Sequence, residues 1–158
     1  MPDGCRGFAI LESENGKFNR ETSDQKEKKA EQLAILVVED DPLVRLTTGS
    51  MLDELGHKYI EVESGEEAVQ LLDEKAIDLV ITDFSMRQMT GGELIERIIK
   101  YHPRVAAILA SGNPIHAINV DAIALHKPYF TNDLEYAIRE ALKKQRDQER
   151  RPPLKYAN

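Results

Sequence analysis

The stretch DLVITDFSMR, residues 78–87, decides the fold and raises the question of function. Its apolar run predicts a buried strand over residues 78–82. The strand runs straight into the carboxylate of Asp83, an acidic residue at the end of an apolar element. Asp83 therefore either caps the next element or is held in place by the strand, and the neighbouring segments decide between the two.

Strand patterns alternate with helix patterns on both sides of this stretch. Apolar runs and alternation predict five strands: residues 34–38, 57–62, 78–82, 105–110 and 123–125. Apolar side chains at helical spacing predict a helix after each of the first three strands and another after Thr131. Because several strands are continuously apolar, the sequence predicts an α/β fold, a doubly wound five-stranded parallel sheet covered on both faces.

Residues suited to helix ends flank these helices. Asp41 followed by Pro42 predicts the start of the first helix, and Gly56 stands where a helix C-terminal glycine belongs. Thr131 is the predicted cap of the last helix. The predicted capping boxes pair Ser64 with Glu67 and Thr90 with Glu93.

The composition bounds the class of protein. A chain of 158 residues, 41% hydrophobic, suits one domain with tails: a flexible polar extension over residues 1–32, the domain over 33–143 and a basic tail over 144–158. The lone Cys5 excludes an internal disulfide and fits a reducing compartment. No run approaches the roughly 18 apolar residues of a membrane helix. We therefore expect a cytoplasmic protein that does not enter a membrane.

The net charge of −7 is unevenly distributed. Residues 34–142 hold nine basic and nineteen acidic residues, whereas residues 143–158 hold six basic and two acidic ones. An acidic body argues against nucleic acid as the main ligand and favours cations or a basic protein partner. For the basic tail, a solvated helix end is favoured over a binding site for RNA, membrane or protein.

Polar side chains follow the predicted strands at their C-terminal ends: Glu39 and Asp40 after the first, Asp83 after the third, Ser111 after the fourth and Lys127 after the fifth. In a parallel sheet these ends share one edge, where sites form. Each residue alone has a simpler explanation as a cap, a turn residue or a surface charge. Taken together, carboxylates this crowded repel one another and can coexist only with a divalent cation or with raised pKa values. Oxygen ligands of this kind suit Mg²⁺. With the ammonium of Lys127 and the hydroxyl of Ser111, they suit phosphoryl transfer to Asp83.

Four motifs in this order resemble the receiver domains of bacterial two-component response regulators. They are ILVVEDDP (35–42), DLVITDFSM (78–86) with MTGGEL (89–94), ILASG (108–112) and HKP (126–128). The resemblance covers about residues 34–143. It implies a flavodoxin-like (βα)5 fold of the CheY type.

The resemblance also implies roles for single residues. Asp83 is the expected phosphoacceptor, taking a phosphoryl group from a phosphohistidine, and Asp40 is expected to bind Mg²⁺ directly. Glu39 occupies the other acidic position, and the backbone carbonyl of Ser85 is the expected third ligand.

Three further positions follow from the same resemblance. Ser111 matches the hydroxyl residue that contacts the phosphoryl group, and Asn113 lies where the family tunes phosphoryl lifetime. Lys127, before a proline that is often cis in the family, is expected to pair with the acceptor or its phosphate.

Three departures from the family pattern stand out. Arg87 replaces the usual proline, which puts an extra cation near the site, and Ala124 replaces the aromatic residue used as a switch. Only fifteen residues separate Ser111 from Lys127. We therefore expect a short or irregular fourth helix near residues 114–119, the region where many members of the family build a dimerisation face.

The sequence thus predicts a stand-alone receiver, because only sixteen residues follow Leu142, too few for an output domain. Its expected partners are a histidine kinase or phosphotransfer protein and an unknown downstream protein. Direct DNA binding is not expected. Nor is the protein expected to be an enzyme, beyond self-catalysed phosphorylation and slow dephosphorylation. Two alternatives stay open. One is a Mg²⁺-dependent phosphohydrolase, disfavoured because Ser85 stands where a second Asp is usual; the other is a degenerate receiver acting as an unphosphorylated scaffold.

Overall fold

The computed structural model describes residues 31–114 and 121–150. Its sheet has five strands, all parallel, in the order β2-β1-β3-β4-β5. The strands are β1 (Ala34–Val38), β2 (Lys58–Val62), β3 (Leu79–Asp83), β4 (Ala106–Ser111) and β5 (Ile123–His126). This order is that of flavodoxin-like doubly wound sheets, with the topological switch point between β1 and β3. The predicted fold class is confirmed.

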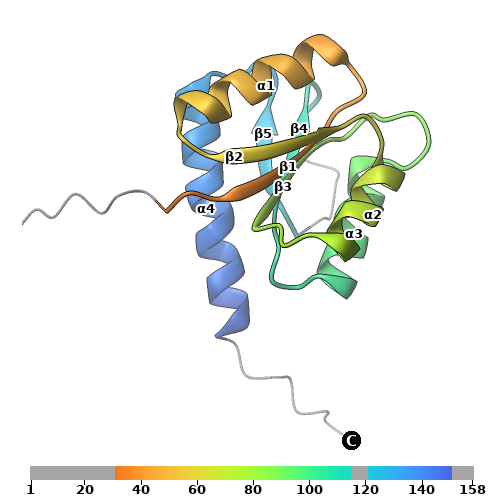
Figure 1. Cartoon of the computed structure of the whole chain (residues 1–158), viewed down its shortest axis with the longest axis vertical. Coiled ribbons are helices and arrows are strands. Elements are labelled where there is room, and N and C mark those ends of the chain that lie inside the picture. Colours follow the sequence, from red (N-terminus) through yellow and green to blue (C-terminus); the bar gives the residue numbers. More distant parts are fainter. Residues whose placement is uncertain (1–30, 115–120, 151–158) are drawn as a thin grey trace, which may run out of the picture. The chain divides into compact units, whose positions relative to one another are not determined.

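Helices cover both faces of the sheet (Figure 1). They are α1 (Pro42–Glu54), α2 (Gly65–Glu74), α3 (Gly91–Tyr101) and α4 (Thr131–Glu149). Helices α1 and α4 lie on one face, and α2 and α3 lie on the other. Right-handed crossovers of this kind bring the C-terminal ends of all strands to the same edge.

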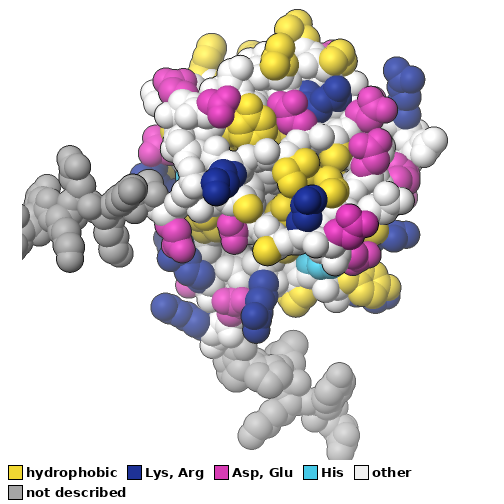
Figure 2. Space-filling model, viewed as in Figure 1, with side chains coloured by type: hydrophobic (Ala, Val, Ile, Leu, Met, Phe, Trp, Pro, Cys, Tyr) yellow, Lys and Arg dark blue, Asp and Glu magenta, His cyan; other side chains and the backbone are white. Residues whose placement is uncertain are grey.

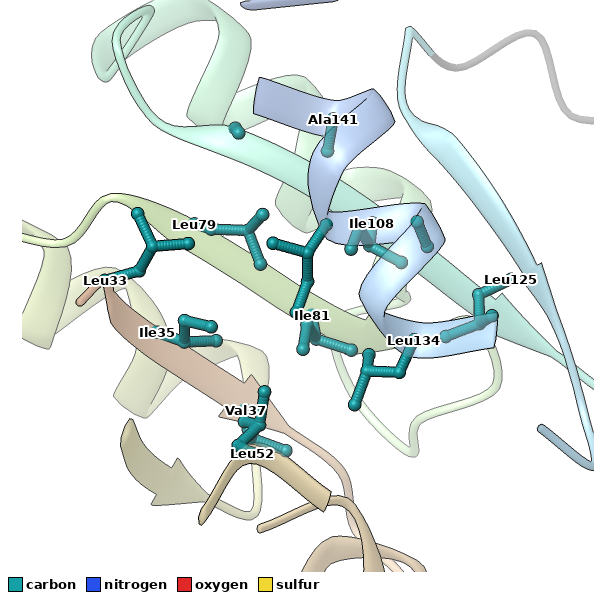
Figure 3. Close-up of a cluster of buried hydrophobic side chains, with 13 residues drawn as sticks. Leu33, Ile35, Val37, Leu52, Leu79, Ile81, Ile108, Leu125, Leu134 and Ala141 are labelled. Atoms are coloured by element: carbon teal, nitrogen blue, oxygen red, sulfur yellow. The ribbon is translucent and has the colours of Figure 1, made fainter. Parts of the chain in front are cut away.

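Alternate residues of the central strands point into two separate cores. Towards α1 and α4, strand β1 contributes Ile35 and Val37 and strand β3 contributes Leu79 and Ile81 to a cluster that also includes Leu134 of α4 (Figure 3). Full burial of a side chain of this size contributes about 1.5–3 kcal/mol to the stability of the folded state. This core holds the central strands β1 and β3 against α1 and α4.

The second core lies between the other sheet face and helices α2 and α3. Leu36 of β1 and Val80 of β3 are fully buried there against Leu94 of α3. Strands β1 and β3 are therefore apolar on both faces and pack against helices on each, as expected for the central strands of a parallel sheet. The end of β3, and with it Asp83, is therefore held from both sides.

The starts of α1 and α3 agree with the predicted caps, whereas α2 and α4 differ in part. At α2, Ser64 Oγ accepts from the amide of Glu67 at 3.3 Å, but the Glu67 side chain does not return the second bond of the predicted capping box. Asp41 Oδ1 accepts from the amides of Leu43 and Val44, and Thr90 and Glu93 form a reciprocal capping box. The prediction that Thr131 caps the last helix is wrong: Phe130 is the N-cap, and its amide donates to Asp133 Oδ2 at 2.9 Å.

Thr131 has another role at this helix start. Its hydroxyl donates to Glu54 Oε2 at 2.9 Å and joins the start of α4 to the end of α1. Helix α4 continues to Glu149, six residues beyond the predicted end of the domain at residue 143. The short fourth helix expected near residues 114–119 falls largely on residues 115–120, which lie outside the described residues.

Among the residues the structure describes, no helix is both long and apolar enough to span a membrane. On the face shown in Figure 2, acidic and basic side chains are interspersed, with hydrophobic groups between them.

Candidate functional site

The end of β1 supplies two acidic side chains. The amide of Glu39 donates to the carbonyl of Val62 at 3.1 Å, so the chain stays attached to β2 one residue beyond the strand. The Glu39 side chain is buried, and its Oε1 accepts from the amide of Asp41 at 3.2 Å. Asp40 lies between them with its side chain 29% exposed. The turn into α1 therefore directs one carboxylate inward and leaves the next open to solvent.

The end of β3 supplies the third carboxylate. Asp83 is the last residue of the strand, pairs with Ala110 of β4 and is only 8% exposed. The predicted strand ended one residue earlier, at Thr82. Asp83 Oδ2 accepts from the amide of Ser85 at 2.8 Å, which orients the carboxylate.

A close backbone contact shapes the loop after Asp83. The amide of Gly91, the first residue of α3, donates to the carbonyl of Phe84 at 3.1 Å. A Cβ at Gly91 would lie 2.1 Å from the carbonyl oxygen of Asp83, so only glycine permits this approach. Helix α3 thus begins directly against the backbone of the candidate site.

The end of β5 brings an ammonium between the carboxylates. Lys127 Nζ donates to Glu39 Oε2 at 2.6 Å and to Asp83 Oδ1 at 2.7 Å. The amide of Lys127 donates to the carbonyl of Ser111 at 2.8 Å, and the Lys127–Pro128 peptide bond is cis. The Lys127 side chain thus contacts Glu39, 88 positions before it in the sequence, and Asp83, 44 positions before it.

Burial and these contacts shift two pKa values. The pKa of Glu39 is raised, because burial disfavours its charged form more than the Lys127 hydrogen bond and charge favour it. Burial alone would lower the pKa of Lys127, but the hydrogen bonds and charges of Asp83 and Glu39 raise it overall. The ammonium therefore stays charged at neutral pH.

The three carboxylates fit a divalent cation. One oxygen from each of Glu39, Asp40 and Asp83 lies within 4.8 Å of the others. When all three are ionised, the Lys127 ammonium offsets only one of their three negative charges. Hard oxygen ligands that are partly open to water suit Mg²⁺. The donor set is therefore of the right kind for the expected metal.

Ser111 reaches the same edge from β4. It is the last residue of that strand and is buried, and its Oγ accepts from the amide of Asn113 at 3.1 Å. The residue pairs of β3 with β4 and of β4 with β5 place it beside the ends that carry Asp83 and Lys127. All six predicted site residues thus lie at one edge, and the structure joins Glu39, Asp83 and Lys127 by direct hydrogen bonds.

The unusual residues lie around this centre. Arg87 is 91% exposed, and its Nε lies 3.9 Å from Asp40 Oδ2. Ala124, at the position where receiver domains usually have an aromatic residue, is exposed on β5 and pairs with Leu109 of β4.

Two contacts near the site come from residues that the sequence did not single out. The Arg45 guanidinium donates to the carbonyl of Glu39 at 2.6 Å, and Tyr129 Oη lies 2.8 Å from Thr48 Oγ1. Burial raises the pKa of Tyr129, despite an opposing effect of that hydrogen bond. Arg45 resembles an ordinary helix-surface cation in the sequence. Tyr129 directly follows the HKP motif (126–128), so an inspection of the residues beside that motif could have found it.

Comparison with known proteins gives a consistent result. A family profile described as the response regulator receiver domain matches residues 35–145, from β1 into α4. The structure is similar to the crystal structure of a response regulator receiver protein from Sinorhizobium medicae WSM419. That similarity has a TM-score of 0.66 at 26% identity and covers 73% of this chain and 98% of the other.

Two curated relatives from Brucella abortus (strain 2308) differ in length. The sensor kinase CckA is 33% identical over 135 residues, which cover 76% of this chain but 14% of CckA. The response regulator receiver protein CpdR is 30% identical over 114 residues, which cover 68% of this chain and 95% of CpdR. The chain spans far less than two thirds of longer relatives, including 10% of a gliding motility regulatory protein of Myxococcus xanthus.

Proposed function

Because the chain belongs to the receiver domains of two-component response regulators, we propose that Asp83 accepts a phosphoryl group from a phosphohistidine. The donor would be a histidine kinase or a histidine phosphotransfer protein. The observation that carries the proposal is the 2.7 Å contact of Lys127 Nζ with Asp83 Oδ1, beside two more carboxylates. An acceptor, an ammonium and an acid cluster that could hold a metal, all at one edge of the sheet, are what phosphoryl transfer needs.

Receiver domains typically bind Mg²⁺ in an acidic pocket, and the cluster in this chain fits that ion. We assign its ligands to the carboxylates of Asp40 and Asp83 and the backbone carbonyl of Ser85, with Glu39 completing the acidic set. When bound, Mg²⁺ neutralises charge on the transferring phosphoryl group.

The side chains of Asp83, Lys127 and Ser111 have separate roles in the proposed phosphoryl transfer. A carboxylate oxygen of Asp83 forms a bond to phosphorus as the bond from phosphorus to the histidine nitrogen breaks, and the electron pair of that bond stays on the imidazole. Lys127, already charged and in contact with Asp83, balances the added negative charge. The Ser111 hydroxyl donates to a phosphoryl oxygen. Attack by water then releases inorganic phosphate and restores the carboxylate.

The proposed output is binding rather than catalysis. Receiver domains are generally signalling modules, and a new dianionic group would shift the surface of this domain between two states. The absence of direct DNA binding is part of the same proposal and is supported by the acidic charge of residues 34–142. A stand-alone role is supported by the similarity to CpdR, of which the matched region makes up 95%. The cytoplasmic location stays a prediction.

Intact mass spectrometry after exposure to acetyl phosphate and Mg²⁺ tests the proposal. Wild-type protein should gain the mass of one phosphoryl group and lose it on standing, and Asp83→Asn should gain none. Equal labelling of both proteins would place the acceptor elsewhere and contradict the assignment.

The same experiment separates the two alternatives. A degenerate scaffold would show no adduct on wild-type protein in either the presence or the absence of Mg²⁺. A phosphohydrolase would turn over p-nitrophenyl phosphate many times per chain, whereas a receiver should not. The residue two positions after Asp83 is Ser85, which offers a hydroxyl rather than the carboxyl that such an enzyme needs as general acid.

A further inference from the structure

Arg87 lies at the open side of the acidic cluster. Its Nε is 3.9 Å from Asp40 Oδ2, and Asp40 is the most accessible of the three clustered carboxylates. Lys127 already contacts the other two, Glu39 and Asp83. The chain thus places a cation of its own on the carboxylate that faces solvent, where an incoming metal ion would arrive.

The surroundings of Arg87 leave it free to move. Its side chain is 91% exposed, and ion pairs at exposed positions are weak and exchange with water. A cavity of about 360 Å³ opens beside it and is also lined by Asp40, Glu63 and Glu66. Within the described residues, Glu66 Oε2 is buried and has no hydrogen-bond partner. A guanidinium that leaves Asp40 therefore has room in a cavity that is lined by further acidic side chains.

We propose that Arg87 competes with Mg²⁺ for the carboxylate of Asp40 and so raises the metal concentration needed to fill the site. This inference rests on the proposed function of the acidic cluster. Mg²⁺ needs the oxygen that the guanidinium contacts, and two like charges this close repel one another. Arg87 would act as a positioning residue: it sets the occupancy of the metal site and does not touch the phosphoryl group.

Titration calorimetry with MgCl₂ on the unphosphorylated full chain, at constant ionic strength, measures this directly. Arg87→Gln should lower the Kd for Mg²⁺ by about three- to tenfold, the range expected for removing one nearby charge. Arg87→Lys keeps the charge and should stay within about twofold of wild type.

The chain offers a matched control in Arg104. Its side chain is 90% exposed, and its Nε lies 3.9 Å from Glu149 Oε1, the same geometry as the Arg87 pair. It precedes β4 and so lies at the opposite edge of the sheet from the site. Arg104→Gln removes the same charge and should leave the Kd unchanged.

An unchanged or higher Kd for Arg87→Gln overturns the inference and leaves the phosphoacceptor proposal intact. An equal decrease in Arg104→Gln also overturns it, because net charge alone would then explain the effect. Binding to Arg87→Gln but not to wild type supports it in its strongest form. Absence of Mg²⁺ binding in every variant overturns both this inference and the metal assignment, while labelling of Asp83 tests the acceptor separately.

Discussion

Lys127 is the residue on which the arrangement of the site depends. Its side chain is 21% exposed, and those of its two carboxylate partners, Glu39 and Asp83, are 6% and 9% exposed. Two carboxylates this poorly hydrated repel one another when no cation lies between them. The ammonium is therefore expected to stabilise the folded state by separating these two carboxylates.

We expect Lys127→Met to lower the free energy of unfolding by about 1–3 kcal/mol at neutral pH in the absence of Mg²⁺, because it leaves both carboxylates without their donor. Urea denaturation followed by circular dichroism measures the change. Lys75→Met, at an exposed lysine beyond α2, is the control and should change the stability little. A Lys127→Met protein as stable as wild type would show that the ammonium is not needed to hold the carboxylates.

The burial of His57 leads us to expect that the stability of the protein depends on pH for a reason unrelated to the candidate site. Burial lowers its pKa from the ordinary 6.5, against an opposing effect of the Glu135 charge, and its Nδ1 accepts from the amide of Leu33. Below the ordinary pKa the unfolded chain binds a proton that the folded protein does not. Stability from this residue is therefore present above pH 6.5 and lost as the pH falls below it.

The corresponding variant is His57→Gln, which keeps an acceptor without the titration. Unfolding free energies measured at about pH 7.5 and about pH 5.5 should differ less in this variant than in wild type. His126→Gln, at an exposed histidine of β5, serves as the control. An identical fall in stability in His57→Gln and wild type would assign the pH dependence to other groups.

At the scale of elements, the start of α3 is pressed against the end of β3 at Gly91. We expect Gly91→Ala to destabilise the protein by about 1–3 kcal/mol, because the new Cβ meets a backbone oxygen that cannot retreat. The loop that carries Ser85 should shift as well, so labelling by acetyl phosphate should slow.

Gly112→Ala is the matched control for that experiment. Gly112 also lies near the site, one residue after β4, but a Cβ there would meet nothing within 4 Å. Its effect on stability should stay within about 0.5 kcal/mol. Comparable losses in the two variants would mean that glycine flexibility, rather than the close contact at Gly91, sets the stability of this region.

Helix α1 predicts where the phosphoryl donor docks. Leu43 and Leu46 are 71% and 63% exposed, and Phe130, just before α4, is 72% exposed. Leu43 also lines an apolar groove with Pro128 and Tyr129, next to Lys127. Under the proposal that Asp83 is the phosphoacceptor, a protein that carries a phosphohistidine has to come within bonding distance of Asp83, and it would then cover this apolar surface.

The double variant Leu43→Glu and Leu46→Glu should slow phosphoryl transfer from the cognate kinase about tenfold or more, a loss typical of removing apolar anchors from an interface. Labelling by acetyl phosphate should stay at the wild-type rate, since a small donor needs no docking surface. Equal slowing with both donors would point to damage of the site and contradict the docking role.

Most elements were predictable because local signals agreed with the fold. Asp41 with Pro42 marks the start of α1, and the apolar run before Asp83 can be satisfied only as a central strand. The start of α4 was missed because Thr131 looks like a cap, although Asp133 bonds the Phe130 amide and the Thr131 hydroxyl is used by Glu54. That choice depends on contacts between helices, which no local pattern contains.

For the whole molecule, metal binding and folding stability are linked. Mg²⁺ should raise the melting temperature, because an ion that binds only the folded state stabilises it by about 1.4 kcal/mol at ten times its Kd. Differential scanning calorimetry with and without Mg²⁺ measures the shift. It should disappear in Asp40→Asn and persist in Asp147→Asn, an exposed carboxylate on α4. A shift that survives Asp40→Asn would mean that the ion binds elsewhere.

The meeting of the site residues was also predictable at this scale, since parallel strands end at one edge. The distances were not: nothing in the sequence says that Lys127 contacts both Glu39 and Asp83, or that Arg45 holds the carbonyl of Glu39. Those contacts depend on how α1 and β5 pack in the core that they share with α4. The roles of the site residues in phosphoryl transfer stay predictions.

The distance along the chain between the groups that meet at Lys127 has a consequence for biosynthesis. Glu39 is made 88 residues before the lysine that neutralises it. A nascent polypeptide that ends after α3 would carry all three acids but not their counter-charge. Under the proposal that Asp83 is the phosphoacceptor, such a polypeptide should be unable to form a stable phosphoaspartate before Lys127 has been made.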